Sequence, residues 1–247
     1  MILLCSDYGL EGPYIGQVEA AIYRHAPMTR VINLCADFPR GNIRAAAALL
    51  AACTVEFPEG TVFFCVVDPG VGTFTSPPVI LEINRRWYVG PDNGIFDQIG
   101  GRAGCTECLE ITWRPEHLSR SFHGRDLYAP VCAWLARGRQ PETRRIAWKR
   151  VQASGDELPE IIYIDHFGNA FTGIRYIVVP QDSILHCGNR DAIRYAGTFA
   201  EAHRGEVFWY GNSIGLVEIA ANQERAAELL GIHIGSSVGF SRGIPEA

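Results

Sequence analysis

Residues 61–72 read TVFFCVVDPGVG, an almost continuous apolar run that ends in a turn of aspartate, proline and glycine. The apolar part, Thr61–Val67, is rich in β-branched and aromatic residues, which predicts a strand buried on both faces. Strands of this kind are typical of parallel sheets covered by helices. Asp68 follows at the end of the strand, in a turn whose glycines allow close approach of a ligand or of another backbone segment.

The sequence on both sides of this strand alternates strand and helix patterns. Short apolar runs at Ile2–Cys5 and Val31–Leu34 predict two more strands, and helical periodicity at Gly16–His25 and Ile43–Val55 predicts the helices between them. This β-α-β-α-β order predicts a mostly parallel sheet with helices on its faces. Further along, we expect a hairpin of 79–83 with 87–89 across Asn84-Arg85-Arg86, and a helix over 126–137.

The texture changes in the second half of the chain. Residues 138–150 are polar, contain Pro141 and lack a strong period, which indicates a linker. Beyond Glu160, turns rich in glycine and asparagine separate short strands and one short helix; the strands are expected at 161–164, 207–210, 216–219 and 237–240, and the helix at 224–230. We therefore predict two domains, an α/β domain at 1–148 and a smaller, mainly antiparallel β domain at 149–247.

Composition excludes several classes of function. The chain has 247 residues and a formal net charge of −5, and its basic residues are scattered, which argues against nucleic acid as a partner. No targeting segment and no apolar stretch long enough to cross a bilayer is evident, so we expect a cytoplasmic protein that does not bind membranes. Cys105 and Cys108 form a Cys-x-x-Cys pair, but no second pair or spaced histidine accompanies them. We therefore expect no metal and no cofactor.

Polar residues gather at four places in the first domain, mostly where strands end. They are Ser6-Asp7-Tyr8-Gly9, the Asp68 turn, Gly90-Pro91-Asp92-Asn93-Gly94 and Phe122-His123-Gly124-Arg125-Asp126. Ligands of open α/β sheets bind beyond the carboxyl ends of the strands. Asp7 can bind the vicinal diol of a ribose, or it can cap the next helix. A histidine between charged residues at a helix start suits acid–base chemistry, although a lone histidine is more often structural.

The second domain adds three more polar segments. These are Ile164-Asp165-His166-Phe167-Gly168-Asn169, Thr198-Phe199 and Gly211-Asn212-Ser213-Ile214-Gly215. Aspartate and asparagine at strand ends can bind amines and amides. Phe199 can stack on a planar base, although most phenylalanines belong to the core.

These motifs, taken in their order along the chain, resemble the S-adenosyl-L-methionine (SAM) hydroxide adenosyltransferase family, whose halide-using relatives are fluorinase and chlorinase. The resemblance extends nearly from end to end and includes the segment Asn212–Ala220. It implies an α/β first domain, a β-barrel-like second domain, and a homotrimer with substrate bound between subunits. The implied activity is hydrolysis of SAM, without a cofactor, to adenosine and L-methionine.

The same resemblance assigns roles to single residues. Asp7 would bind the ribose hydroxyls, Asn169 an adenine edge and Asp165 the methionine ammonium, while Phe199 would pack on the adenine. Asp68 and His123 would orient the attacking water. Further substrate-binding positions implied by the matched motifs are Tyr8, Asn93, Gly124, Arg125, Asn212, Ser213, Ala221 and Gln223.

Two positions depart from the family pattern. Where the hydrolases carry an arginine after the Asp68 turn, this chain has Thr75, and Arg125 or Arg86 would have to supply the missing charge. Where the halide enzymes carry an aromatic residue, Gly41 falls nearby. The retained Asp68 and His123 favour water over halide. The lost arginine leaves open a second interpretation, a sensor that binds SAM or adenosine without reaction.

Overall fold

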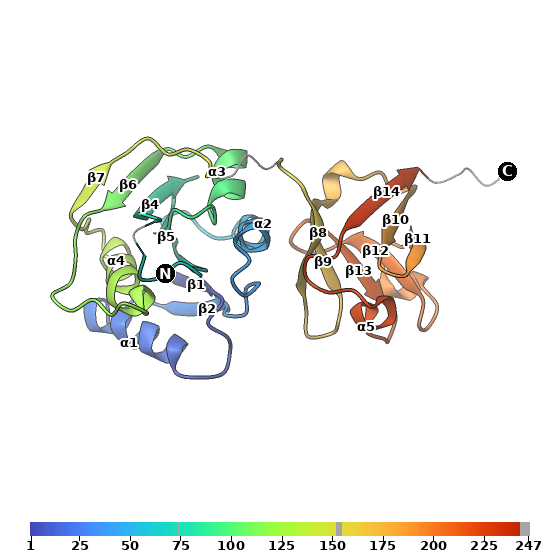
Figure 1. Ribbon diagram of the computed structural model, residues 1–247, viewed down its shortest axis with the longest axis horizontal. Helices are drawn as coiled ribbons and strands as arrows, with labels where there is room; N and C mark the ends of the chain where they lie inside the picture. The colour runs from blue at the N-terminus through green and yellow to red at the C-terminus, as the bar shows by residue number, and fades with distance from the viewer. Residues whose placement is uncertain (74, 152–154, 243–247) are drawn as a thin grey trace. The chain divides into compact units, whose positions relative to one another are not determined.

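The computed structural model describes residues 1–73, 75–151 and 155–242, except for the side chains of Arg190 and Asp191. The chain divides into two compact units, Met1–Ala153 and Ser154–Ala247 (Figure 1). Each unit is built around its own seven-stranded sheet.

The sheet of the first unit has the strand order β2-β1-β3-β5-β4-β6-β7. Its strands are β1 (Ile2–Ser6), β2 (Val31–Cys35), β3 (Val62–Val66), β4 (Pro78–Ile83), β5 (Arg86–Pro91), β6 (Glu107–Ile111) and β7 (Thr143–Arg145). The pairs β1–β2, β1–β3 and β3–β5 are parallel, whereas β4–β5, β4–β6 and β6–β7 are antiparallel. The sheet is therefore mixed, and the expectation of a mostly parallel sheet is wrong for one half of it.

The antiparallel half follows from local sequence. Asn84 and Arg85 both have positive φ angles, 50° and 59°, as a tight two-residue hairpin loop with the right twist requires. This loop turns β4 back onto β5, as expected, and β6 then adds to the free edge of β4. The segment expected as a linker, 138–150, contains β7, which pairs with β6 at Leu109 and Arg145. That expectation was wrong because a short polar edge strand has no hydrophobic period.

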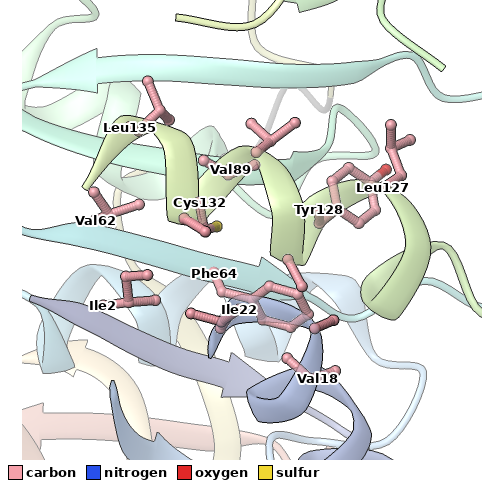
Figure 2. Packing of buried hydrophobic residues seen from close by; sticks show 14 of the residues in the cluster. Ile2, Val18, Ile22, Val62, Phe64, Val89, Leu127, Tyr128, Cys132 and Leu135 are labelled. Atoms are coloured by element: carbon pink, nitrogen blue, oxygen red, sulfur yellow. The ribbon is translucent and has the colours of Figure 1, made fainter. Parts of the chain in front are cut away.

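Helices cover both faces of this sheet. They are α1 (Tyr14–His25), α2 (Ile43–Cys53), α3 (Asp97–Ala103) and α4 (Ala129–Leu135). On one face, Ile22 of α1 and Cys132 of α4 belong to the buried cluster around Phe64 of β3 (Figure 2). On the other face, Tyr88 donates a hydrogen bond to Thr54 Oγ1, 3.4 Å away, at the end of α2. Successive side chains along a strand point to opposite faces of the sheet, so each strand packs against both layers of helices.

The helix expected over 126–137 begins differently. Residues Gly124–Tyr128 form one π-helical turn (η1), and α4 continues from Ala129. Insertions of this kind occur often at functional sites.

The sheet of the second unit has the order β14-β10-β11-β12-β13-β9-β8. Its strands are β8 (Leu158–Ile164), β9 (Ala170–Arg175), β10 (Ser183–Cys187), β11 (Arg190–Tyr195), β12 (Val207–Gly211), β13 (Leu216–Ala221) and β14 (Val238–Arg242). Neighbours are antiparallel except β11–β12, which are parallel. The sheet curls into a half-barrel, and a bridge between Glu160 and Ser237 links its two edges. Helix α5 (Ala226–Leu230) packs against β13.

Three cysteines lie side by side in the first sheet. Cys5 of β1 is in register with Cys35 of β2 and with Cys65 of β3, and Cys5 and Cys65 are fully buried. All eight cysteines of the chain are free. Across the described residues, no helix is long and apolar enough to cross a membrane.

Candidate functional site

Three of the predicted site residues meet at one edge of the first sheet. Strands β1, β3 and β5 are parallel neighbours, so their carboxyl ends lie together. Asp7 follows β1, Asp68 follows β3 and Asn93 follows β5. Asn93 Nδ2 donates to the carbonyl of Val67, 2.9 Å away, and so fixes the backbone immediately before Asp68.

The Asp68 turn is held from both sides. Asp68 Oδ1 accepts a hydrogen bond from Gly70 N at 3.0 Å. Gly72 has a φ of 84°, and a Cβ there would lie 2.4 Å from the carbonyl oxygen of Arg120, so only glycine fits. Thr75, where the resemblance implies an arginine, places its hydroxyl 2.8 Å from that of Thr73. It supplies no positive charge to the turn.

Asp68 lies in an unusual electrostatic setting. Burial raises the pKa of its carboxyl, and the nearby Asp7 carboxylate raises it further, while the Gly70 N–H and His123 act in the opposite direction. Asp7, Asp68 and His123 are therefore close enough to influence one another. A carboxylate with a raised pKa is a stronger base than an ordinary aspartate.

His123 immediately precedes the π-helical turn η1, and Gly124 allows that turn to approach Tyr8, two residues after the end of β1. A Cβ at Gly124 would lie 2.0 Å from the Tyr8 hydroxyl. The Tyr8 ring packs edge-on against Phe64 and Phe122, at centroid distances of 6.3 and 5.6 Å. Burial raises the pKa of Tyr8, which keeps its hydroxyl neutral. Tyr8 and Gly124 thus pack closely together at the start of η1, directly after His123.

Asp68 and His123 line the same hollow, which we call the Asp68 cavity. It has a volume of about 720 Å³ and is also lined by Gly70, Thr73, Leu118 and Tyr128. This volume exceeds the roughly 30 Å³ that one water occupies in the liquid. The structure therefore brings the two predicted catalytic residues together in one accessible space.

Two arginines that sequence reasoning missed, Arg114 and Arg120, also line the Asp68 cavity. Arg114 Nη1 donates to the carbonyls of Ile111 and Trp113, at 2.6 and 2.8 Å. The backbone of Arg120 touches the Asp68 turn at Gly72. The sequence offered one signal for Arg120, since it lies only three residues before the predicted catalytic residue His123.

The arginines suggested as replacements lie elsewhere. Arg86 donates to the carbonyls of Phe57 and Val55, at 2.7 and 3.0 Å. Arg125 forms an ion pair with Asp126, at 2.6 Å, and donates to Gln17 at 2.9 Å, in a different hollow. Neither guanidinium lines the Asp68 cavity.

The second unit has a hollow of its own, which we call the Asp165 cavity, with a volume of about 840 Å³. It gathers residues from the β8–β9 turn, the turn at Phe199, the β12–β13 turn and the end of β13. All seven predicted site residues of this domain line it: Asp165, Asn169, Phe199, Asn212, Ser213, Ala221 and Gln223.

Hydrogen bonds fix the polar groups of the Asp165 cavity. Asp165 Oδ1 accepts from Asn169 N at 2.9 Å, and Asp165 Oδ2 accepts from Asn169 Nδ2 at 3.4 Å. Asn212 Oδ1 accepts from the backbone N–H groups of Ile214 and Leu216, at 3.2 and 2.9 Å. Phe199 is 38% exposed, so its ring is free to cover a flat ligand.

Sequence reasoning also missed Tyr210 and Glu218, which line the Asp165 cavity. Tyr210 donates a hydrogen bond of 2.6 Å to Glu218 Oε1. Glu218 is only 2% exposed, and burial raises the pKa of its carboxyl. The available signal was a lone acidic residue within the apolar strand LVEIAA, since a buried carboxylate is rare without a specific partner.

Comparison with known proteins places both units in one family. The model of the SAM hydroxide adenosyltransferase N-terminal domain matches residues 2–145, and that of its C-terminal domain matches residues 159–239. The (R)-S-adenosyl-L-methionine hydrolases of Salinispora arenicola and Thermus thermophilus are 34% and 33% identical to this chain. The match covers 98% and 96% of this chain, respectively, and 98% of each relative.

A solved structure of an uncharacterized conserved protein from Thermotoga maritima superposes with a TM-score of 0.86. It is 29% identical, and the match covers 98% of this chain and all of that chain. The resemblance inferred from the ordered motifs is confirmed: the chain belongs to the SAM hydroxide adenosyltransferase family.

Proposed function

We propose that this protein is an enzyme that hydrolyses SAM to adenosine and L-methionine. Family membership and the hydrolase relatives support this activity. The observation that carries the proposal is the shared cavity of Asp68 and His123, beside the Asp7 carboxylate. A base next to a group that can hold a ribose is the arrangement needed for attack at C5′.

The chemical step is a substitution at the ribose C5′. A water oxygen forms a bond to C5′ while the C5′–S bond breaks, and the electron pair of that bond neutralises the sulfonium to give the methionine thioether. Asp68 accepts the proton of the water, and His123 helps to orient it. The sulfonium is already a good leaving group, so positioning of the water is the main requirement, worth roughly 7–11 kcal/mol in favourable models.

Ligand binding is divided between the two units. In this proposal Asp7 and Tyr8 hold the ribose side, while Asn93 and Gly124 support them. Phe199 covers the adenine, Asn169 and the backbone at Ala221 and Gln223 contact its edge, and Asp165, Asn212 and Ser213 bind the methionine end. The ion pair of Arg125 with Asp126 gives Arg125 a supporting rather than a direct role.

The assembly is also part of the proposal. Each unit carries groups for only part of the ligand, and we infer a homotrimer in which residues 1–148 of one subunit and residues 149–247 of another complete the site. Light scattering coupled to size-exclusion chromatography tests this, and a monomeric enzyme with full activity would contradict it. A cytoplasmic location stays a prediction from the sequence.

The decisive experiment incubates the purified protein with SAM in ¹⁸O-water. Labelled adenosine together with unlabelled methionine is expected, because the oxygen enters at C5′. Label in neither product, with the substrate consumed, would contradict attack by water at C5′.

Thr75 gives a second candidate function some support, because the turn beside Asp68 lacks the family arginine. A sensor would bind SAM tightly and form no adenosine over hours. A halide-using enzyme would form 5′-halo-5′-deoxyadenosine when fluoride or chloride is added. Both outcomes are visible in the same incubation.

A further inference from the structure

We propose that Glu218 is a positioning residue of the Asp165 cavity that joins its aromatic side to its acidic side and favours a cationic ligand over a neutral one. The inference rests on the proposed function, because the ligand in question is SAM. Glu218 acts through neighbouring side chains and through its charge.

Glu218 occupies the middle of the second sheet. It lies on β13, opposite Tyr210 of β12 and Phe171 of β9. With 2% exposure it is one of the few buried polar residues in the described part of the chain. A carboxylate at such a position is costly unless donors surround it. Its presence there calls for a function that an apolar residue could not perform.

Three side chains surround this carboxylate. Tyr210 donates to Oε1 at 2.6 Å, and the amides of Asn212 and Asn169 also lie close enough to stabilise its charged form. Asn169 in turn is bonded to Asp165, and Asn212 shapes the turn that carries Ser213. Removing the Glu218 charge therefore weakens the hydrogen bond that holds Tyr210 and changes the electrostatic setting of Asn169 and Asn212.

The other side of Tyr210 leads to the aromatic part of the cavity. The Tyr210 ring lies 5.7 Å from the ring of Phe199, in an edge-on arrangement. The hydroxyl of Tyr210 is held by Glu218, so its ring cannot rotate away from Phe199 without breaking a short hydrogen bond. Glu218 thus links the surface proposed for adenine to the group proposed for the ammonium.

Three carboxylates line the cavity, those of Asp165, Glu218 and Glu224, and none of them forms an ion pair with a cation among the described residues. Asp165 lies close enough to Glu218 to raise its pKa. Arg225 lines the cavity, but its guanidinium donates to the carbonyl of His166 and to Glu228. Three carboxylates in a partly enclosed space favour a ligand with an ammonium and a sulfonium. S-adenosylhomocysteine, the neutral thioether analogue, lacks the sulfonium charge.

The test compares the full-length Glu218→Gln variant with wild type. Glutamine keeps the size and an acceptor for Tyr210 but removes the charge. We expect the Kd of SAM, measured by calorimetry, and the KM to rise about tenfold, as expected for one partly screened charge. We expect the Kd of S-adenosylhomocysteine and the kcat to change less than about twofold, because the charge of the sulfonium is what differs.

Glu157→Gln is the matched control. Glu157 lies in the same unit, is bound to Arg175 and does not line the cavity. It should leave both affinities unchanged. Equal weakening of SAM and S-adenosylhomocysteine by Glu218→Gln would overturn the charge selectivity, and unchanged binding of both would overturn the whole inference.

Thermal unfolding distinguishes positioning from folding. Burial raises the pKa of Glu218, so its ionisation opposes folding at neutral pH. Glu218→Gln should therefore unfold at the same or a higher temperature than wild type at pH 8, and the difference should shrink in acid. If that variant does not fold, Tyr210→Phe, which keeps the charge, is expected to weaken both ligands alike; selective loss of SAM would then overturn the inference.

The outcome for wild type separates this inference from the proposed function. Wild type that binds SAM but forms no adenosine would refute hydrolysis and leave the role of Glu218 open to the same binding test. Wild type that hydrolyses SAM, with an unaffected Glu218→Gln variant, would refute only the role of Glu218. Failure of wild type to bind SAM would refute both.

Discussion

The Asp68 cavity and the Asp165 cavity differ in how their polar groups are held. In the Asp165 cavity, carboxylates and amides hydrogen-bond to one another and to the backbone, as with Asp165 to Asn169 and Glu218 to Tyr210. In the Asp68 cavity, the Asp68 carboxylate accepts one bond, from Gly70, among the described residues. The arrangement in the Asp165 cavity suits tight, preorganised binding. The arrangement in the Asp68 cavity leaves a carboxylate oxygen available for a water.

The difference teaches that binding and reaction place opposite demands on a carboxylate. A carboxylate that orients a ligand works best when its neighbours fix it. A carboxylate that accepts a proton needs an unoccupied lone pair and a raised pKa, and burial provides the latter for Asp68. Substitutions in the two cavities should therefore affect kcat and KM separately.

The largest expected effect is that of Asp68→Asn. Asparagine keeps the size and the bond from Gly70 but cannot accept the proton, so kcat should fall about 10³-fold, within the usual range for a general base. Affinity for SAM should remain within about threefold, because the amide makes no new contact. Adenosine formation and calorimetry measure the two. Asp7→Asn is the contrasting variant, with a raised KM and a nearly unchanged kcat.

Asp165→Asn should produce the opposite pattern. Loss of a charged hydrogen-bond partner for the ammonium is expected to weaken binding of SAM about 10- to 100-fold. The kcat at saturating SAM should hardly change, since in the proposed site Asp165 binds the ammonium and touches neither C5′ nor the attacking water. Steady-state kinetics over a wide range of SAM concentrations measures both, and a large fall in kcat with unchanged KM would contradict the division of roles.

Gly124→Ala tests how the reaction side is built. The added methyl group would meet the Tyr8 hydroxyl, and overpacking of this kind typically costs about 1–3 kcal/mol of the free energy of unfolding. Denaturant unfolding measures it. Gly16→Ala is the control, because Gly16 lies in α1 with open space around it. The higher helix propensity of alanine should raise the free energy of unfolding of this variant by up to about 1 kcal/mol. Equal stability of the two variants would contradict the close contact.

The smallest effect is a shift of the pH profile. Asp68 must be deprotonated to act as a base, so activity should fall as pH decreases through its pKa, which is raised above 3.8. Thr75→Arg adds a positive charge to the turn, lowers that pKa and should move the acid limb of kcat/KM to lower pH. Thr75→Gln, long but neutral, should leave the limb in place. An identical shift in both variants would rule out a charge effect.

The sequence predicted most of the elements but only part of the topology. The strand predicted at 61–67 and the helix predicted at 43–55 were clear, because a long apolar run is compatible with few other structures. The mixed sheet was not predicted, because the direction of a strand relative to its neighbours depends on the edge of the sheet that its hairpin joins. Strands β9, β10 and β11 were missed because their short polar alternation resembles that of a loop.

The sequence predicted those site residues that belong to recognisable motifs. Asp165, Asn169, Phe199, Asn212, Ser213, Ala221 and Gln223 line one cavity, although their roles remain proposals. Arg114, Arg120 and Glu218 were missed for a physical reason. Arg114 and Arg120 reach the Asp68 cavity only through the fold of a long loop, and Glu218 is hidden in an otherwise apolar strand.

Chemical modification of the cysteines in the first sheet can report local separation of its strands. Cys5 and Cys65 lie in adjacent central strands, and the neighbouring thiol together with burial raises the pKa of Cys5 well above its usual value. Both sulfurs are fully buried, so an alkylating reagent reaches neither of them while the strands are closed. The rate at which an alkylating reagent modifies them therefore reports how often β1 and β3, the strands that precede Asp7 and Asp68, separate.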